Sequence, residues 1–462
     1  MALAASRQQQ GSSRPRLLQA VFDAFAQHDL RQKLLFTAAM LVIFRFVSHI
    51  PIPNVNPNLV EIAVDQSELL GLFNLFSGGA LRQMSIAMLG VYPYITASII
   101  MQLITPLVPQ LQALAQEGEQ GRNRRELYQH WLTVPLCVVQ GYAQLVILHN
   151  QVEAVGVPNA MFDPSLTGED ALATVTALFC ITAGTMFLVW LGQLITENGI
   201  GNGVSIIIFG GIVAGMPGLI SRTFNSDLGL FAIAMLAVVA LLVVFSIVFM
   251  QEAVRKIPVQ YAKSVFRAGK MYRQSGQSHI PLKVNSAGMI PLIFAFSIVI
   301  LPVTFAQFVL DSSTTPWIRD IARFITDVLG PGTGQGGSGA SPGFYILIFL
   351  LVVGFSFFYT YVIFMQQNLA ENLQKQGGFV PGIRPGRPTA EYIQRVLVRI
   401  TWAGALFLGF IAILPYLITN WFDINALTIS STGMLIVVGV VLDTMKQLEA
   451  QLLMRSYEGF IR

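Results

Sequence analysis

Long apolar runs alternate with polar segments along most of this chain. An α-helix needs about 20 apolar residues to cross the hydrocarbon core of a bilayer. Runs of this kind predict ten transmembrane spans, near 34–50, 83–106, 131–149, 171–193, 204–221, 229–250, 286–309, 343–366, 396–419 and 429–447. The first run contains Arg45, and the fifth follows the glycine-broken stretch Gly199–Gly203. This pattern predicts an all-α, polytopic membrane protein.

The composition agrees with a chain that faces lipid. Hydrophobic residues make up 54% of it and charged residues only 11%, whereas a soluble domain carries about 25% charged residues. Cys137 and Cys180 both lie in apolar runs without a CxxC spacing, which predicts neither a disulfide nor a zinc site. Residues 1–33 are polar and basic and lack a signal-peptide cleavage pattern, so we expect the first run to be a retained span.

Lysine and arginine are distributed unequally between the two sides of the predicted membrane. The tails and alternate connections hold 23 of them, against at most five on the other side. Because cytoplasmic loops carry the excess of Lys and Arg, both termini are predicted to be cytoplasmic. The basic loops 251–285 and 367–395 should then project into the cytoplasm, and the glycine-rich linker 331–343 should be external.

The span count also predicts two halves of equal size. Five spans precede the 216–228 connection and five follow it, without a convincing sequence repeat between them. The predicted organisation is an N-terminal half at 34–221 and a C-terminal half at 222–447, flanked by cytoplasmic tails at 1–33 and 448–462.

The predicted spans contain almost no acidic residues away from their ends. Asp443 lies near the end of the last span, and all five histidines lie in loops or at span ends. An ion-coupled transporter usually places Asp, Glu or His near the midplane, so the composition disfavours that alternative class. A membrane enzyme, the third class considered, lacks an HExxH metal pair and a GxSG-like nucleophile turn. We therefore predict no catalytic residue, cofactor or metal.

Several short motifs follow one another in order from about residue 30 to the C-terminus, and they fall on the predicted sides of the membrane. They are IPIP at 50–53, GLFNLFSGGAL at 71–81, YPYITASII at 92–100, GIGNG at 199–203, PVQYAK at 258–263, PLKVN at 281–285, GGFVPGIRPG at 377–386 and VLDT at 441–444. On these motifs the chain resembles the SecY family, the central channel subunit of the bacterial Sec protein translocase.

The resemblance implies a clamshell of two five-helix halves, hinged at 216–228, that conducts unfolded secretory proteins. A lateral gate, between the second and third spans on one side and the seventh and eighth on the other, would release transmembrane segments into lipid. Its predicted residues are Thr96, Ser98, Gln102 and Asn285. A short external plug near 70–81 would contain Leu72, Phe73, Leu75, Phe76, Gly78 and Gly79.

The resemblance also implies an aliphatic ring that closes the pore. Aliphatic side chains cannot replace an ion's hydration shell, so a narrow apolar passage dewets and resists ions. They make only non-directional contacts, so the ring can still yield to a polypeptide. The predicted ring residues are Val91, Ile95, Ile208, Ile293 and Ile436.

The partners implied by the resemblance act mainly on the two basic loops. These loops would dock the SecA motor or a ribosome, whose RNA is a dense anionic surface, through Arg255, Lys256, Arg267, Lys270, Arg384 and Arg387. Membrane topology alone is the alternative explanation of their charge. The other expected partners are SecE-like and SecG-like small membrane subunits, signal sequences, unfolded secretory or membrane proteins, and the lipid bilayer. The expected location is the bacterial cytoplasmic (inner) membrane.

Overall fold

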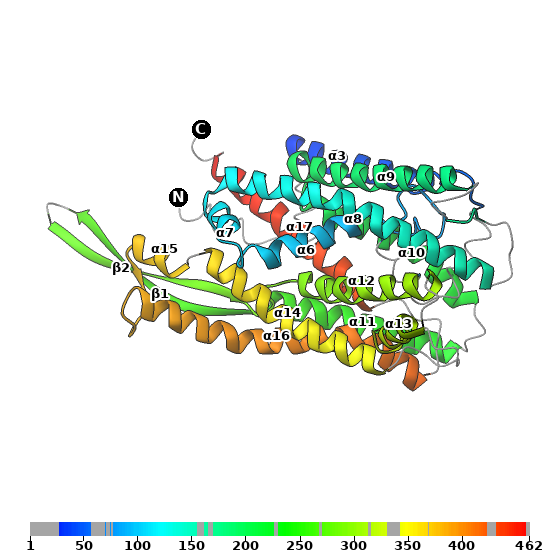
Figure 1. Cartoon of the computed structure of the whole chain (residues 1–462). Helices are drawn as coiled ribbons and strands as arrows, with labels where there is room; N and C mark the ends of the chain where they lie inside the picture. Colours follow the sequence, from blue (N-terminus) through cyan, green and yellow to red (C-terminus); the bar gives the residue numbers. More distant parts are fainter. Residues whose placement is uncertain are drawn as a thin grey trace.

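The computed structural model is a bundle of long helices with a β-hairpin at one end (Figure 1). It describes residues 27–56, 70, 74, 77–154, 161–164, 170–225, 230–267, 270–312, 316–329, 342–367, 369–422 and 431–458. The predicted plug residues Leu72, Phe73, Leu75 and Phe76, and the linker 331–343 up to residue 341, lie outside the described residues.

Each of the ten predicted spans overlaps one helix. These helices are α3 (His28–Val47), α6 (Tyr92–Ile104), α8 (Glu119–Ala154), α9 (Ala171–Asn198), α10 (Gly203–Asn225), α11 (Leu230–Glu252), α12 (Ile290–Ser312), α14 (Pro342–Gln367), α16 (Arg387–Phe422) and α17 (Ser431–Glu458). Six of the described helices are long and apolar enough to cross a membrane, and α6 and the apolar part of α10 are shorter. The predicted helical, polytopic fold is confirmed in this form.

Three short helices and a small sheet complete the described chain. The helices are α7 (Pro109–Gln116), α13 (Pro316–Leu329) and α15 (Leu369–Lys375). The sheet has the order β2-β1-β3, with β1 at Val254–Arg267, β2 at Lys270–Lys283 and β3 at Gly378–Phe379. Antiparallel pairing runs from Val254 opposite Lys283 to Arg267 opposite Lys270, so β1 and β2 form one long hairpin.

The sequence predicted only a projecting loop at 251–285, whereas in the structure β1 and β2 form a hairpin there. Ile257 and Val259 are buried at alternate positions of β1, and Leu282 is buried on β2. Alternation of this kind is typical of a strand with one covered face. These side chains pack on Leu373 and Ile393, which belong to α15 and α16. The two basic loops therefore share one small hydrophobic core.

The second predicted span begins later than the sequence indicated. Residues 83–91 form turns instead of helix, and α6 begins at Tyr92. Met84 and Gly90 have positive φ angles of 44° and 57°, which are incompatible with a right-handed helix. The apolar run is nevertheless buried, because Met84, Met88 and Leu89 all belong to the main core. Hydropathy therefore located the segment but not its conformation.

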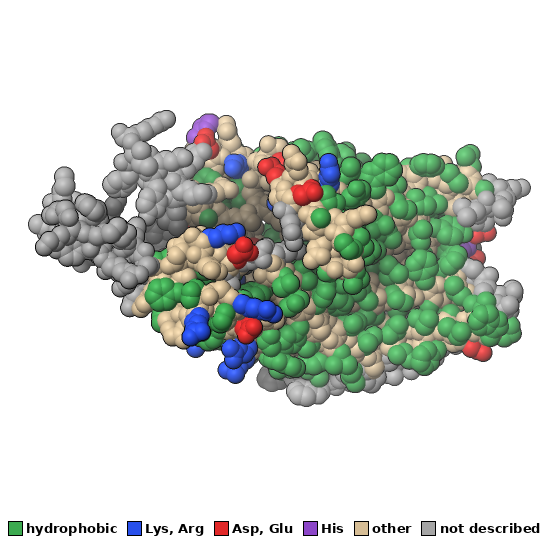
Figure 2. All heavy atoms as spheres, turned by 60° about the vertical axis from the view of Figure 1, so that its left-hand side comes forward, with side chains coloured by type: hydrophobic (Ala, Val, Ile, Leu, Met, Phe, Trp, Pro, Cys, Tyr) green, Lys and Arg blue, Asp and Glu red, His purple; other side chains and the backbone are tan. Residues whose placement is uncertain are grey.

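The main core joins the two predicted halves of the chain. α6 and α8 contact α12, and α10 contacts α17. Around this core the bundle presents hydrophobic side chains to its surroundings, while most Lys and Arg side chains in view gather at the hairpin end (Figure 2). An apolar belt with a charged end is the surface expected of a protein that spans a bilayer.

Candidate functional site

The five predicted ring residues are all buried in the main hydrophobic core. Val91 caps the start of α6, Ile95 lies one turn further on, and α10, α12 and α17 contribute one residue each. None of the five side chains is more than 9% exposed. The structure thus brings aliphatic side chains from both predicted halves into one core, namely Val91, Ile95, Ile208, Ile293 and Ile436.

The described part of the predicted plug enters the same core. Leu70 is fully buried and belongs to the main core. Two local hydrogen bonds fix the segment that follows: Gly79 N–H donates to the Asn74 carbonyl oxygen at 2.8 Å, and Leu81 N–H donates to Ser77 Oγ at 3.1 Å. Ala80 and Leu81 also belong to the main core, so the described residues at both ends of the segment pack into the bundle interior.

A pair of glycines brings the backbone of this segment close to the backbone of α10. A Cβ placed on Gly211 of α10 would lie 2.5 Å from Gly78 Cα, and a Cβ on Gly78 would lie 2.5 Å from Gly211 Cα. Gly78 also has a φ of +69°, which L side chains rarely adopt. Arg45 of α3 donates from Nη1 to the Gly78 carbonyl oxygen at 3.2 Å. Gly78, one of the two predicted plug glycines, is thus held by α3 and α10.

The predicted lateral gate has a hydrogen-bonded seam between α6 and α12. Tyr92 Oη donates to the Ser297 carbonyl oxygen at 3.2 Å. Nearby, the rings of Tyr142 on α8 and Phe308 on α12 meet edge to face with centroids 5.6 Å apart. The seam therefore joins helices of the two sides of the predicted gate.

A small, mainly apolar pocket along this seam includes two buried glutamines in its lining. Gln140 and Gln144 lie one turn apart on α8, facing Thr304 of α12 and Tyr92 of α6. Within the described residues, neither side-chain amide atom of Gln140 has a hydrogen-bond partner, and Gln144 Nε2 has none either. Buried amides without partners destabilise the arrangement that buries them. Pairing of these amides with water or with a polar group of a partner would stabilise this part of the seam.

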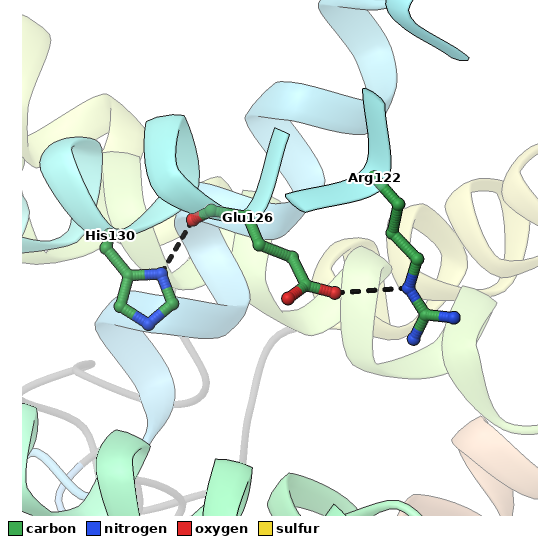
Figure 3. Close-up of polar contacts among 3 residues, drawn as sticks. All are labelled: Arg122, Glu126 and His130. Carbon is green, nitrogen blue, oxygen red and sulfur yellow. Dashed lines mark hydrogen bonds and ion pairs between the residues drawn. The ribbon is translucent and has the colours of Figure 1, made fainter. Parts of the chain in front are cut away.

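α6 and α8 are linked to each other on the same side of the gate. Arg122, Glu126 and His130 lie one turn apart on α8 (Figure 3). Arg122 Nε contacts Glu126 Oε1 at 3.2 Å, and His130 Nδ1 lies 2.6 Å from the Glu126 carbonyl oxygen, as for a bond donated by the Nδ1–H tautomer. The His130 ring meets the Tyr94 ring of α6 edge to face, with centroids 5.6 Å apart. We expect α6 and α8 to move as a pair.

The four residues predicted for the gate occupy different surroundings. Thr96 is buried and donates to the Tyr92 carbonyl oxygen on its own helix at 3.0 Å. Gln102 donates to Ser98 Oγ at 3.1 Å, also within α6. Asn285 is buried before α12, with its backbone close to Gly404 of α16. The gate role of these residues stays a prediction.

The predicted docking residues lie around the sheet at the hairpin end. Pairing of Gln260 with Phe379 and of Tyr261 with Gly378 joins the two basic loops directly. Exposed side chains around this junction are those of Arg255, Lys256, Arg384 and Arg387. Arg267 and Lys270 face each other in register near the hairpin tip, but their side chains lie outside the described residues.

Comparisons with known proteins agree with this arrangement. The SecY family model matches residues 85–445. Proteins called protein translocase subunit SecY from Streptomyces scabiei and Halalkalibacterium halodurans are each 42% identical to the chain, and the matches cover 96% of the chain and 100% of each relative. The chain belongs to the SecY family.

Solved structures show the same fold at low identity. One, described as a protein-conducting channel, has a TM-score of 0.61 at 15% identity and covers 91% of this chain and 92% of its own. Another, a SecY protein described by the role of its plug domain, has the same TM-score at 17% identity. The SecY fold is therefore recognisable at 15–17% identity.

The hydrogen bond between Tyr92 and Ser297 can be tested by mutation in this SecY family member. Tyr92→Phe removes the hydroxyl that donates to the Ser297 carbonyl oxygen and should weaken the contact between α6 and α12. One such bond contributes about 0.6–1 kcal/mol, which is about three- to fivefold in the ratio of closed to open channel. Export of a reporter with a defective signal sequence should rise accordingly. Tyr94→Phe is the matched control, because Tyr94 contacts α8 instead of α12. Equal export by the two variants would contradict the role of the seam.

Sequence reasoning missed four residues that the SecY structure places at these contacts. Gln140 and Gln144 stand four apart in an apolar run, a pattern typical of polar contacts between membrane helices. Arg45 inside the first span and Gly211 in the fifth were also visible. Their partners were not, because the contacts join segments far apart in the chain.

Proposed function

We propose that the chain is the channel through which the Sec translocase passes unfolded proteins, closed by its aliphatic ring and its plug. The observation that supports this proposal is that Val91, Ile95, Ile208, Ile293 and Ile436 are all buried in the main core, to which both predicted halves contribute. An all-aliphatic closure excludes hydrated ions and has no directional groups that would select one polypeptide sequence. The chain acts as a channel subunit and not as an enzyme.

The closed state would have three supports. The aliphatic ring would seal the centre, the plug segment 70–81 would cover it from outside, and the seam between α6 and α12 would close the bundle sideways. Opening along the seam would separate the pair α6 and α8 from α12, giving transmembrane segments of the substrate a path into lipid. The pocket that Gln140 and Gln144 line between α6, α8 and α12 would lie on that path. The predicted halves would turn about the predicted hinge at 216–228, whose first ten residues belong to α10 in the structure.

The proposal also names partners and a location. The exposed basic side chains around β1, β3 and the start of α16 would bind the SecA motor or a ribosome on the cytoplasmic side of the bacterial inner membrane. SecE-like and SecG-like subunits would cover exposed apolar helix faces. α11 is a candidate surface for one of them, because only 12% of its apolar window is buried. Leu241, Phe245 and Phe249 lie on its exposed surface.

The experiment that tests the ring replaces two of its residues. Ile95→Asn together with Ile293→Asn puts two polar groups into the constriction, which should wet it and lower the barrier to ions. We expect a several-fold rise in resting conductance in planar bilayers and passage of substrates with defective signal sequences.

The matched control carries the same chemistry at buried positions outside the ring. Ile99→Asn together with Leu292→Asn uses the same two helices, and both wild-type side chains are at most 2% exposed. A leak that appears equally in both double variants would reflect general loosening of the core. A tight seal and intact signal discrimination in the ring variant would refute this assignment of the ring.

A further inference from the structure

Helix α13 has three distinct faces. It connects α12 to α14 and packs against both. Ala322 and Thr326 form the centre of its buried face. A second face carries charged side chains, all exposed, and a third carries exposed apolar side chains. A helix of the ordinary surface type has only a buried and a polar face, so the third face needs an explanation.

The exposed apolar face consists of large side chains with helical spacing. Trp317, Ile321, Phe324 and Val328 follow one another at intervals of four, three and four residues, which places them on one side of a helix. Trp317 is 65% exposed and Phe324 is 67% exposed. Water is a poor environment for such a row of side chains.

The position of α13 limits what can cover this face. Figure 1 shows α13 at the end of the bundle opposite the β-hairpin, lying across the direction of α12 and α14. Its 14 residues span about 21 Å, too little to cross a bilayer core of about 30 Å. The two helices that α13 contacts also expose apolar side chains, Phe305 on α12 and Ile346 near the start of α14. α13 therefore packs against helices that themselves present apolar surface to their surroundings.

The charged face of α13 is electrically balanced. Arg319 and Arg323 carry the positive charges, and Asp320 and Asp327 the negative charges. A surface helix that binds anionic lipid electrostatically is usually rich in Lys and Arg on its polar face. Because the positive and negative charges of α13 are equal in number, a contact between α13 and lipid would depend on burial of its apolar side chains. Such a contact does not require an anionic headgroup.

We propose that α13 lies flat in the interfacial layer of the leaflet opposite the hairpin, with Trp317, Ile321, Phe324 and Val328 among the acyl chains. Tryptophan is enriched at this depth because its ring is both apolar and polar. The charged face then points to water, and the buried face holds α12 and α14. The lipid contact does not depend on channel function. It ties the ends of two predicted gate helices to one leaflet, so that moving either helix displaces α13 within the lipid.

The test measures which medium surrounds each face. The full chain, with Cys137→Ala and Cys180→Ser to remove its two cysteines, is labelled with a nitroxide at Phe324→Cys or at the matched position Arg319→Cys. Both are reconstituted into phosphatidylcholine vesicles. Collision with oxygen, which concentrates in lipid, is compared with collision with a water-soluble nickel complex. We expect a several-fold higher ratio of oxygen to nickel collision at position 324 than at 319.

A second pair, Ile321→Cys and Arg323→Cys, repeats the comparison in case the first disturbs folding, which size-exclusion profiles would reveal. High nickel collision at both 324 and 321 would place the helix in water and overturn the proposal. Protection of these positions from both reagents would mean that protein covers the face, which also overturns it. A lipid contact that appears only with anionic lipid at low salt would overturn the apolar account of its origin.

Discussion

Replacing Arg384 with glutamate should abolish SecA-driven export while leaving the chain inserted in the membrane. Arg384 is exposed in a turn between β3 and α16. Hydrogen bonds hold this turn: Ile383 N–H donates to the Val380 carbonyl oxygen at 3.1 Å, and Thr389 Oγ1 donates to the Arg384 carbonyl oxygen at 2.8 Å. An exposed guanidinium on a fixed turn suits a bidentate contact with a partner's carboxylate, and glutamate would repel that carboxylate.

Export is measured with membrane vesicles, purified motor, ATP and a secretory precursor. Lys375→Glu is the matched control, since it reverses a charge at the same end of the molecule, where Lys375 pairs with Glu371 at 3.0 Å. Exposed pairs of this kind contribute about 0–1 kcal/mol to stability, so the control should fold. Arg384→Lys keeps the charge but loses the fork of the guanidinium and should retain only part of the activity. Normal export by the Arg384→Glu channel would rule out its role in motor coupling.

Gly211→Ala should release the plug and make the resting channel leak. The added Cβ would lie 2.5 Å from Gly78 Cα, so α10 or the plug segment must move. Overpacking of a tight contact costs about 1–3 kcal/mol, which would lower the ratio of closed to open channel by about 5- to 150-fold if the plug yields. Resting conductance in planar bilayers is the readout.

Gly215→Ala is the matched control for this substitution. Gly215 lies one turn further along α10, and a Cβ there meets nothing within 4 Å. Alanine is the better helix former by about 1 kcal/mol, so this variant should be as stable as the parent or more so. If Gly211→Ala conducts no more than Gly215→Ala, the glycine contact does not hold the plug closed.

The fold could be predicted largely from hydropathy, because the bilayer imposes a length on every span. The same reasoning placed helix ends poorly. α6 starts at Tyr92 instead of residue 83, since positive φ angles at Met84 and Gly90 produce turns that hydropathy does not detect. Hydropathy also missed the hairpin. The apolar residues Ile257 and Val259 make only a short alternating pattern, and Pro258 between them argues against a strand.

The candidate site could be predicted only in part. The ring residues came from the family resemblance, and apolar patterning alone does not distinguish Ile208 from any other buried isoleucine. The contacts of Arg45 with Gly78 and of Tyr92 with Ser297 join residues 33 and 205 positions apart. A local pattern contains no information on such pairings, because they arise only when the helices pack.

The helix that follows the docking turn has a mechanical consequence. From Arg387 to Leu414 α16 is helical over 28 residues, about 42 Å, before Pro415. Along that length α16 packs closely against α14. The rings of Trp402 and Phe357 have centroids 4.9 Å apart, and a Cβ on Gly409 would lie 2.7 Å from the Phe349 ring. If a motor binds at this turn as proposed, a push there would act on a lever arm that continues into the predicted membrane span. The motor's stroke outside the membrane would then tilt a helix inside it, without a flexible joint to absorb the work.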